Sequence, residues 1–258
     1  SDITIYLVSD DKEFVLTENS SMQAPNGVRL EFKSNEINCS DELVMPPLQN
    51  NVVVQKLINK DDWVDGRAGM QYRDLIPDRL GGRFIASHIR IKKGGPVSDY
   101  VHYHHIRFQL IYCHKGWVKA VYEDQGEPFR LTAGSCVIQP PEIRHRVLFA
   151  SDNIEVIEIG VPAEHVTTID HEMGLPNGPA NPQRRFQGQS FVHHKLEEAI
   201  WQPFRLTGFE ARDTGISTGT QGVAGVQVAR PAFGTPDWAQ HDADILFTFV
   251  MDGTMVLE

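Results

Sequence analysis

Short β-type runs separated by turn residues dominate the middle of the sequence and limit what the chain can fold into. Clusters such as Gly94-Gly95-Pro96 and Pro140-Pro141 mark places where the chain turns. Between such breaks the sequence is rich in branched and aromatic residues, over the runs 83–91, 108–113, 117–122, 135–139, 145–149 and 154–160. Runs at this regular spacing are typical of a sandwich or barrel. Helical periodicity is scarce, with one short helix expected over 194–200, so we predict an all-β fold.

The balance of charges bears on the partners of the chain. The 258 residues include 24 lysines and arginines against 34 aspartates and glutamates, a net charge of −10. A nucleic-acid surface needs a positive field, so we expect no nucleic-acid partner. No apolar run approaches the roughly 20 residues that span a bilayer, and the first residues lack the features of a signal peptide. We therefore expect a cytoplasmic protein that binds a small-molecule substrate and no membrane, and a homo-oligomer such as a dimer stays open.

The sequence contains an internal repeat. Residues 69–74, Gly-Met-Gln-Tyr-Arg-Asp, are followed 139 positions later by Gly-Phe-Glu-Ala-Arg-Asp at 208–213. Trp63 recurs as Trp201 after 138 positions, and a Lys-Gly pair at 115–116 corresponds to Asp-Gly at 252–253 after 137. An offset that drifts by only two residues is typical of a duplicated domain with small insertions. We therefore predict two copies of one β domain.

A segment rich in proline, glycine and asparagine separates the two copies. It covers residues 173–190, and this composition favours irregular chain over packed strands. We predict a first domain over residues 61–172, a linker over 173–190 and a second domain over 191–258. Residues 1–60 are expected to supply additional N-terminal strands.

Histidines at alternate positions indicate a metal site. His102 and His104 stand at the expected end of a strand, and because strand side chains alternate, both project from one face and can hold one ion. Gln109 follows His104 by five positions, so it can join them only if the chain turns at 105–107. His145 begins a later strand. These side chains are the candidate ligands.

At these positions the sequence resembles the cupin superfamily, whose two motifs read G-x5-HxH-x3,4-E-x6-G and G-x5-P-x-G-x2-H-x3-N. The first motif is met by Gly95, His102, His104, Gln109 and Gly116, and the second by Gly134, Pro140 and His145. The match departs from the family in one extra residue after Gly95, in Gln109 where glutamate is usual, and in Glu142 where glycine is frequent. The resemblance covers residues 60–165 well and 195–258 in part. It implies a bicupin, an all-β protein of two jelly-roll barrels.

The resemblance also implies the ligands of a metal ion. Carried over position by position, they are His102, His104 and His145, with Gln109 as a candidate fourth. Three imidazoles suit iron, nickel, copper or zinc better than magnesium or calcium. We expect a divalent transition metal, iron first, with nickel, zinc, copper or manganese as alternatives. Three protein ligands leave positions open on the ion, as a catalytic site requires.

The neutral Gln109 affects the expected chemistry. Without a carboxylate ligand the ion keeps its full charge toward a substrate, and a base is missing there. The ligand set is similar to that of three-histidine iron dioxygenases, so we predict a metal-dependent enzyme of the oxygenase type that acts on a small organic substrate. Two alternatives stay open: a non-catalytic ligand-binding or structural bicupin, and a metal-dependent isomerase or lyase. Arg107 and Arg144 beside the motifs either hold a substrate carboxylate or are solvated loop charges.

The second copy lacks most of these ligands. His241 corresponds to His104, whereas Ala239 stands where the first copy has His102. Leu246 takes the place of the glutamine. One imidazole cannot hold a divalent ion usefully, so we expect no metal in the second copy.

The N-terminal region is expected to complete the second barrel. Residues 40–47, Ser-Asp-Glu-Leu-Val-Met-Pro-Pro, resemble 134–141 in spacing but have no histidine after them. An open barrel exposes strand edges, which proteins normally cover or pair. We predict that residues of about 28–47 pair with strands in 225–258, and the alternative is an unrelated strand before a Pro-Pro turn.

Overall fold

The computed structural model describes residues 21–23, 29–31, 43–56, 62–66, 69–234 and 238–256, and every strand pair in this part of the chain is antiparallel. The predicted all-β class is confirmed. All six predicted runs contain a strand, and the described helices are the single turns α1 (Arg79–Gly82) and α2 (Ile216–Gly219). The helix expected over 194–200 is only a 3-10 turn, Leu196–Glu198.

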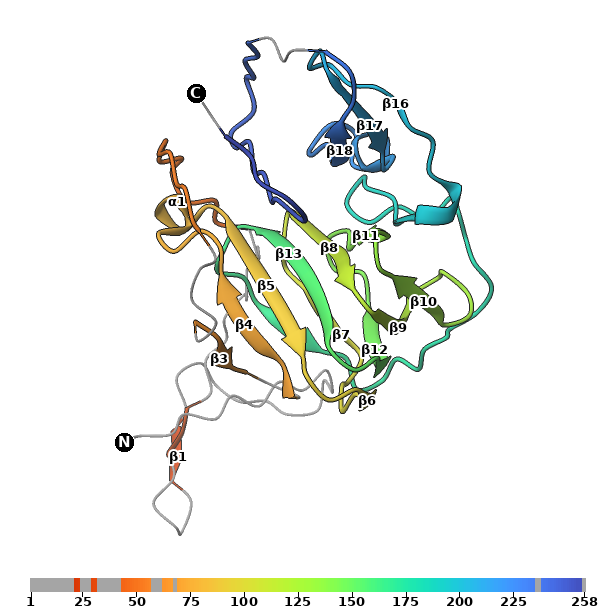
Figure 1. Cartoon of the computed structure of the whole chain (residues 1–258). Coiled ribbons are helices and arrows are strands. Elements are labelled where there is room, and N and C mark those ends of the chain that lie inside the picture. The colour runs from red at the N-terminus through yellow and green to blue at the C-terminus, as the bar shows by residue number, and fades with distance from the viewer. Residues whose placement is uncertain are drawn as a thin grey trace. The chain divides into compact units, whose positions relative to one another are not determined.

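Two sheets cover the residues predicted as the first domain. The larger runs in the order β15-β11-β8-β13-β5-β4-β3, and the smaller in the order β10-β9-β12-β7-β14, with β6 paired to β12. The strands of the larger sheet are β3 (Val64–Asp65), β4 (Gln71–Asp74), β5 (Ile85–Ile91), β8 (Phe108–Lys115), β11 (Cys136–Ile138), β13 (Ile154–Val161) and β15 (Val192–His194). Those of the smaller sheet are β6 (Gly95–Pro96), β7 (His102–His104), β9 (Trp117–Tyr122), β10 (Phe129–Thr132), β12 (His145–Ala150) and β14 (Thr167–Ile169). Figure 1 shows β4, β5, β13 and β8 side by side in the larger sheet.

Alternation along the strands separates two hydrophobic clusters. The interior cluster lies between the sheets and joins Cys113, Val137 and Ile154 of the larger sheet to Val118, Ala120, Tyr122, Leu131 and Ala150 of the smaller. The outer cluster takes the other face of the larger sheet, with Phe108, Leu110 and Tyr112 of β8 and Ile157 of β13. Side chains of β8 and β13 therefore point alternately into the first domain and away from it.

The C-terminal half packs on the outer cluster. Ile216 and Val228 are buried in it, and Ile245, Phe247 and Phe249 pack against it. Three strands, β16 (Gln202–Pro203), β17 (Phe209–Asp213) and β18 (Gln227–Pro231), form a sheet in the order β16-β17-β18. Within the described residues, 238–256 contain no strand. The second barrel therefore stays a prediction.

Hydrogen bonds connect the predicted linker to the first domain. The backbone N–H of Asn181 donates to the carbonyl of Asp124 at 2.7 Å, and Gln189 Nε2 donates to the carbonyl of Arg107 at 2.8 Å. Beyond the linker, β15 pairs with β11 and so extends the larger sheet past the predicted boundary at residue 190. The first domain thus takes in a strand that the sequence analysis places in the second.

The N-terminal region differs from the prediction in the part that is described. β1 (Ser21–Gln23) pairs with β2 (Arg29–Glu31), and residues 43–56 form no strand. The predicted pairing of 28–47 with 225–258 is therefore not found among the described residues, and 32–42 lie outside them. A partner five residues away in sequence costs less loop-closure entropy than one some two hundred residues away, which favours the β1–β2 pairing.

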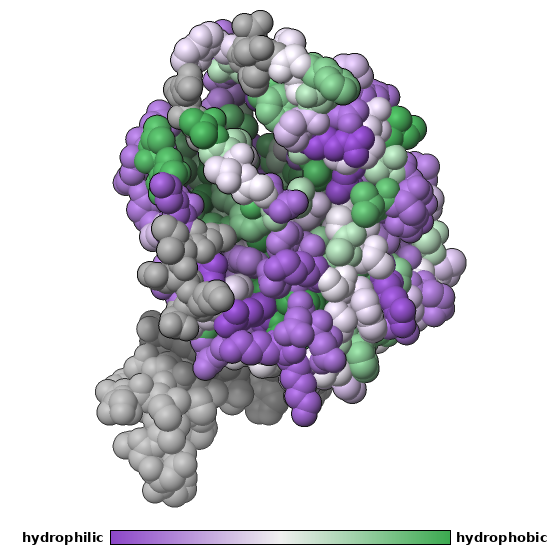
Figure 2. All heavy atoms as spheres, viewed as in Figure 1, coloured by the Kyte–Doolittle hydropathy of each residue, from purple (hydrophilic) through white to green (hydrophobic). Residues whose placement is uncertain are grey.

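Hydrophobic side chains stay exposed in two segments that are far apart in the sequence. Val52 and Val54 are exposed, as are Leu246, Val250 and Val256. Figure 2 shows hydrophobic residues gathered around a hollow at the upper left of the view. None of the helices among the described residues is long and apolar enough to cross a membrane.

Candidate metal centre

Three histidines from two neighbouring strands converge in the interior of the first domain. His102 and His104 lie on β7, and His145 on β12 is paired directly with His102. All three side chains are buried, and their ring centroids are 4.3 to 5.2 Å apart. One ligand atom from each lies within 4.8 Å of the other two. The spacing predicts this convergence, while the role of the three as ligands stays a prediction.

Oxygen atoms fix the orientation of each imidazole. His102 Nδ1 lies 2.8 Å from the carbonyl of Tyr100, and His145 Nδ1 lies 2.9 Å from the carbonyl of Ile143. A carbonyl only accepts, so Nδ1 carries a hydrogen in both rings and Nε2 is the nitrogen that can bind a metal. His104 Nδ1 lies 2.8 Å from Thr167 Oγ1, a hydroxyl that can accept in the same way. Contacts of this kind hold metal-binding histidines in position.

An aspartate supports the His102 side of the cluster. Asp99 Oδ1 lies 3.5 Å from His102 Nδ1, and Asp99 Oδ2 accepts a hydrogen bond of 3.0 Å from the backbone N–H of Val147. Val147 follows His145 by two residues on β12, so this side chain ties the two histidine strands together. A carboxylate behind an imidazole raises its basicity as a ligand.

Gln109 lies in the same interior. β7 ends at His104 and β8 begins at Phe108, which confirms the predicted turn over 105–107. On β8, Gln109 shares its face with Ile111 and Cys113 of the interior cluster, and its side chain is buried. Its Oε1 atom is buried and has no hydrogen-bond partner in the described part of the chain. This oxygen is available to a ligand, and its coordination of a metal stays a prediction.

Tyr122, Gln139 and Glu158 were missed by the sequence analysis. Gln139 Nε2 donates to the Tyr122 hydroxyl at 3.0 Å, and the Tyr122 ring stacks on His145 with centroids 5.6 Å apart. Burial raises the pKa of this hydroxyl, so it stays protonated at neutral pH. The Glu158 carboxyl group accepts a hydrogen bond from the Gln109 amide. Each stands within a predicted β run, and the alternation of that run is the signal that could have placed it inside.

The cations beside the motifs are not directed at the cluster. Arg144 Nε donates to Asp170 Oδ2 at 3.2 Å, and its guanidinium stacks on the ring of Tyr103. The pKa of Asp170 is lowered by the backbone N–H of Met173 and by Arg144. Arg107 is exposed. Both cations therefore behave as loop charges in this structure.

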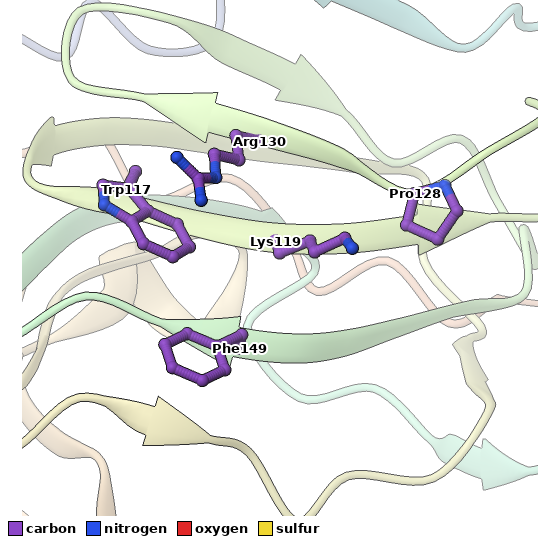
Figure 3. A pocket seen from close by; sticks show the side chains of 5 residues that line it. All are labelled: Trp117, Lys119, Pro128, Arg130 and Phe149. Carbon is purple, nitrogen blue, oxygen red and sulfur yellow. The ribbon is translucent and has the colours of Figure 1, made fainter.

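Two further features lie apart from the cluster. His241, the counterpart of His104 in the second copy, is exposed in a segment without strands. A shallow cleft on the smaller sheet, drawn in Figure 3, is lined by Trp117, Lys119, Pro128, Arg130 and Phe149. Trp117 and Lys119 alternate with the interior residues of β9, so the cleft opens on the outer face. It does not reach the histidines.

The three imidazoles form a fitting donor set for a divalent transition metal. They offer neutral nitrogen ligands, which iron, nickel, copper and zinc accept readily. Ligand nitrogens about 2.0–2.1 Å from one zinc ion lie near one another, and small side-chain rotations would close the present separations. Burial, fixed tautomers and the unsatisfied oxygen of Gln109 all agree with a bound cation.

Comparison of the chain with family models finds no match, and comparison with curated proteins finds none either. Among solved structures, this one is similar to an RmlC-like cupin from Shewanella frigidimarina, at 23% identity and a TM-score of 0.33, over 41% of this chain and 86% of that one. It is similar to salicylate 1,2-dioxygenase from Pseudoaminobacter salicylatoxidans in complex with gentisate, at 13% identity and a TM-score of 0.32, over 40% and 30%. A mutant oxalate decarboxylase from Bacillus subtilis matches at 14% identity and a TM-score of 0.45, over 70% and 58%.

Proposed function

We propose that His102, His104 and His145 bind one divalent transition metal ion, iron first, in the first domain. The observation that carries the proposal is the convergence of three buried imidazoles whose orientation is fixed through Nδ1. A buried cluster of this kind suits a small molecule, and the net charge of −10 disfavours nucleic acid.

The proposed activity is an oxygenase reaction on a small organic substrate. When bound, the ion supplies positive charge and open positions that orient substrate and dioxygen. The chain supplies the remaining parts. The interior cluster excludes water from one side, while the neutral imidazoles leave the charge of the ion undiminished. The Tyr122 ring, whose hydroxyl is kept protonated by burial, stacks on His145.

The test begins with protein purified without a histidine tag and loaded with Fe²⁺ under nitrogen. Oxygen uptake is then recorded with thiols, diketones and hydroxylated aromatic acids in turn. We expect one class to consume oxygen in proportion to the substrate lost. If the protein holds iron and no class consumes oxygen or changes chemically, the oxygenase proposal fails and a binding protein is the better account.

A metal-dependent isomerase or lyase is the second candidate, and Glu158 is the observation that favours it. The sequence analysis finds no carboxylate among the candidate ligands. In the structure, however, the carboxyl group of Glu158 accepts a hydrogen bond from Gln109. Reactions that rearrange or eliminate need such a group near the substrate. Conversion of a substrate without oxygen would support this candidate over the first.

A further inference from the structure

An acidic side chain stands behind Gln109 in the interior of the first domain. Gln109 Nε2 donates to Glu158 Oε1 at 2.6 Å. On β13, Ile157 and Ile159 belong to the outer cluster and Val156 to the interior one, so Glu158 shares the inner face with Val156. The pair therefore lies on the inner face of the larger sheet, between β8 and β13.

This contact fixes the direction of the Gln109 amide. Glu158 Oε1 accepts from the amide N–H of Gln109, so the amide oxygen is not the atom that faces Glu158. The amide is planar, and its Oε1 is consequently turned away from Glu158. That oxygen is buried and unsatisfied among the described residues, on a side chain that is only 2% exposed. A buried acceptor without a partner is unfavourable, and a bound cation removes that cost.

The surroundings of Gln109 border the histidine cluster. Its backbone carbonyl accepts from the N–H of Gln139, the residue whose side chain holds the hydroxyl of the tyrosine stacked on His145. Gly160 is paired opposite Gln109 on β13. A Cβ at Gly160 would lie 3.7 Å from the ring of His165, and that ring lies 5.3 Å from the ring of His104. These contacts connect the surroundings of Gln109 to those of His145 and His104.

We propose that Glu158 is a positioning residue, which holds the Gln109 amide so that Oε1 faces the ion bound by the three histidines. This inference rests on the proposed metal site and adds a fourth neutral donor to it.

The test is a titration of the metal-free protein with Co²⁺ alone, followed by visible absorption, which responds to the number of ligands on cobalt. Glu158→Leu removes the acceptor, and Gln109→Leu removes the oxygen. We expect each to weaken Co²⁺ binding about 10-fold and to give the same altered spectrum, since outer contacts of metal ligands contribute 10–100-fold. The double variant should bind no more weakly than Gln109→Leu, because the two side chains act as one unit.

Glu158→Gln separates position from charge. Its amide oxygen still accepts from Gln109, so we expect Co²⁺ affinity within about threefold of the wild type. Glu155→Leu, on the same strand but directed to His88 and Lys115, is the matched control and should leave the affinity and the spectrum unchanged.

The outcomes separate the inference from the proposed function. A wild-type protein that binds no Co²⁺ overturns the metal site itself. Wild-type binding that Glu158→Leu leaves unchanged overturns the positioning role alone, as does a Glu158→Gln variant as weak as Glu158→Leu. If Glu158→Leu does not fold, the double variant Gln109→Glu with Glu158→Gln replaces it as the test. This variant keeps one hydrogen-bond donor and one acceptor between positions 109 and 158. It should bind Co²⁺ at least as tightly as the wild type, and weaker binding overturns the inference.

Discussion

The two copies of the repeat share a local arrangement around one tryptophan. In the first copy, Trp63 packs against the guanidinium groups of Arg73 and Arg90, whose Cζ atoms lie 4.4 and 3.9 Å from the ring centroid. In the second, Trp201 has Arg212 at 5.9 Å and Arg230 at 3.9 Å. Strands β3, β4 and β5 are neighbours at one edge of the larger sheet, in the same order as β16, β17 and β18 in theirs, and a single helical turn follows the middle strand in each. The repeat seen in the sequence is thus a repeat of structure over these elements.

Beyond these three strands the copies differ. In the first, β8 lies between β11 and β13 and pairs with both of them. Its counterpart after the offset of 137 is 245–252, where Ile245, Phe247 and Phe249 pack inward and Leu246 and Val250 are exposed, without a strand. The alternation of apolar and polar residues decides which side chains are buried. A ladder of backbone hydrogen bonds also needs neighbouring strands to pair with. The histidine cluster needs them too, because His145 reaches His102 only through the pairing of β12 with β7.

The comparison is sharpened most by Arg212, the counterpart of Arg73, because its hydrogen bonds to Tyr112 and Gly134 join the second copy to the first domain. It is buried, and it lies 2.7 Å from His194 Nε2, 2.7 Å from the carbonyl of Gly134 and 3.2 Å from the Tyr112 hydroxyl. We expect Arg212→Ala to lower the free energy of unfolding by about 3 kcal/mol, because it leaves buried acceptors unsatisfied. Urea unfolding measures this loss.

Arg230→Ala is the matched control for that variant. Arg230 stacks on the same tryptophan and pairs with Glu210, but its side chain is half exposed. An exposed pair contributes little, so we expect a loss of at most about 1 kcal/mol. Equal losses for the two variants would show that Arg212 does not join the copies.

The next effect concerns pH and His193, on the strand that crosses from the second copy into the first domain. Burial lowers the pKa of His193 from 6.5 to about 4. The unfolded chain therefore binds a proton that the folded chain does not between these values, and stability is lost as the pH falls from 6.5 toward 4. We expect His193 to lower the free energy of unfolding by about 2 kcal/mol between pH 7 and pH 4.5.

His193→Phe tests this by urea unfolding at both pH values. The ring can still stack on Phe129, which lies 4.1 Å from His193 between centroids, and the titration is gone. The variant should lose less stability on acidification than the wild type, whereas substitution of the exposed His241 by glutamine should not change the profile. If His193→Phe loses as much unfolding free energy on acidification as the wild type, His193 is not the source of the pH dependence.

The smallest effect compares the glycine that begins the repeated motif. Gly69 and Gly208 both have positive φ, 74° and 84°. A Cβ at Gly69 meets no atom within 4 Å, whereas one at Gly208 would lie 2.8 Å from the carbonyl oxygen of Gly234. We expect Gly69→Ala to cost about 1 kcal/mol through the backbone alone and Gly208→Ala about 1 kcal/mol more. Thermal unfolding that ranks Gly69→Ala as the more harmful would contradict this assignment of contacts.

Local pattern accounts for what the sequence predicts well. Branched runs between glycine and proline gave the six main strands, and alternation placed His102 and His104 on one face. Gln109 was placed with them through a turn that the structure contains. Each of these inferences depends on residues close together in sequence.

The contacts that the sequence does not predict depend on the pairing of strands that are far apart in the sequence. Glu158 meets Gln109 only because β13 pairs with β8, and Tyr122 meets His145 only because β9 pairs with β12. The pairing of β15 with β11 across the predicted linker is of the same kind. No local pattern states which strands become neighbours.

The most direct test of the account is the metal content of a matched pair of variants, His104→Ala in the first copy and His241→Ala in the second. Each protein is purified without a histidine tag, dialysed against Fe²⁺ or Zn²⁺ and measured by elemental mass spectrometry. We expect about one ion per chain in the wild type and in His241→Ala, and almost none in His104→Ala, because two imidazoles hold an ion far less tightly than three. Equal metal content in the two variants would contradict a metal site formed by His102, His104 and His145.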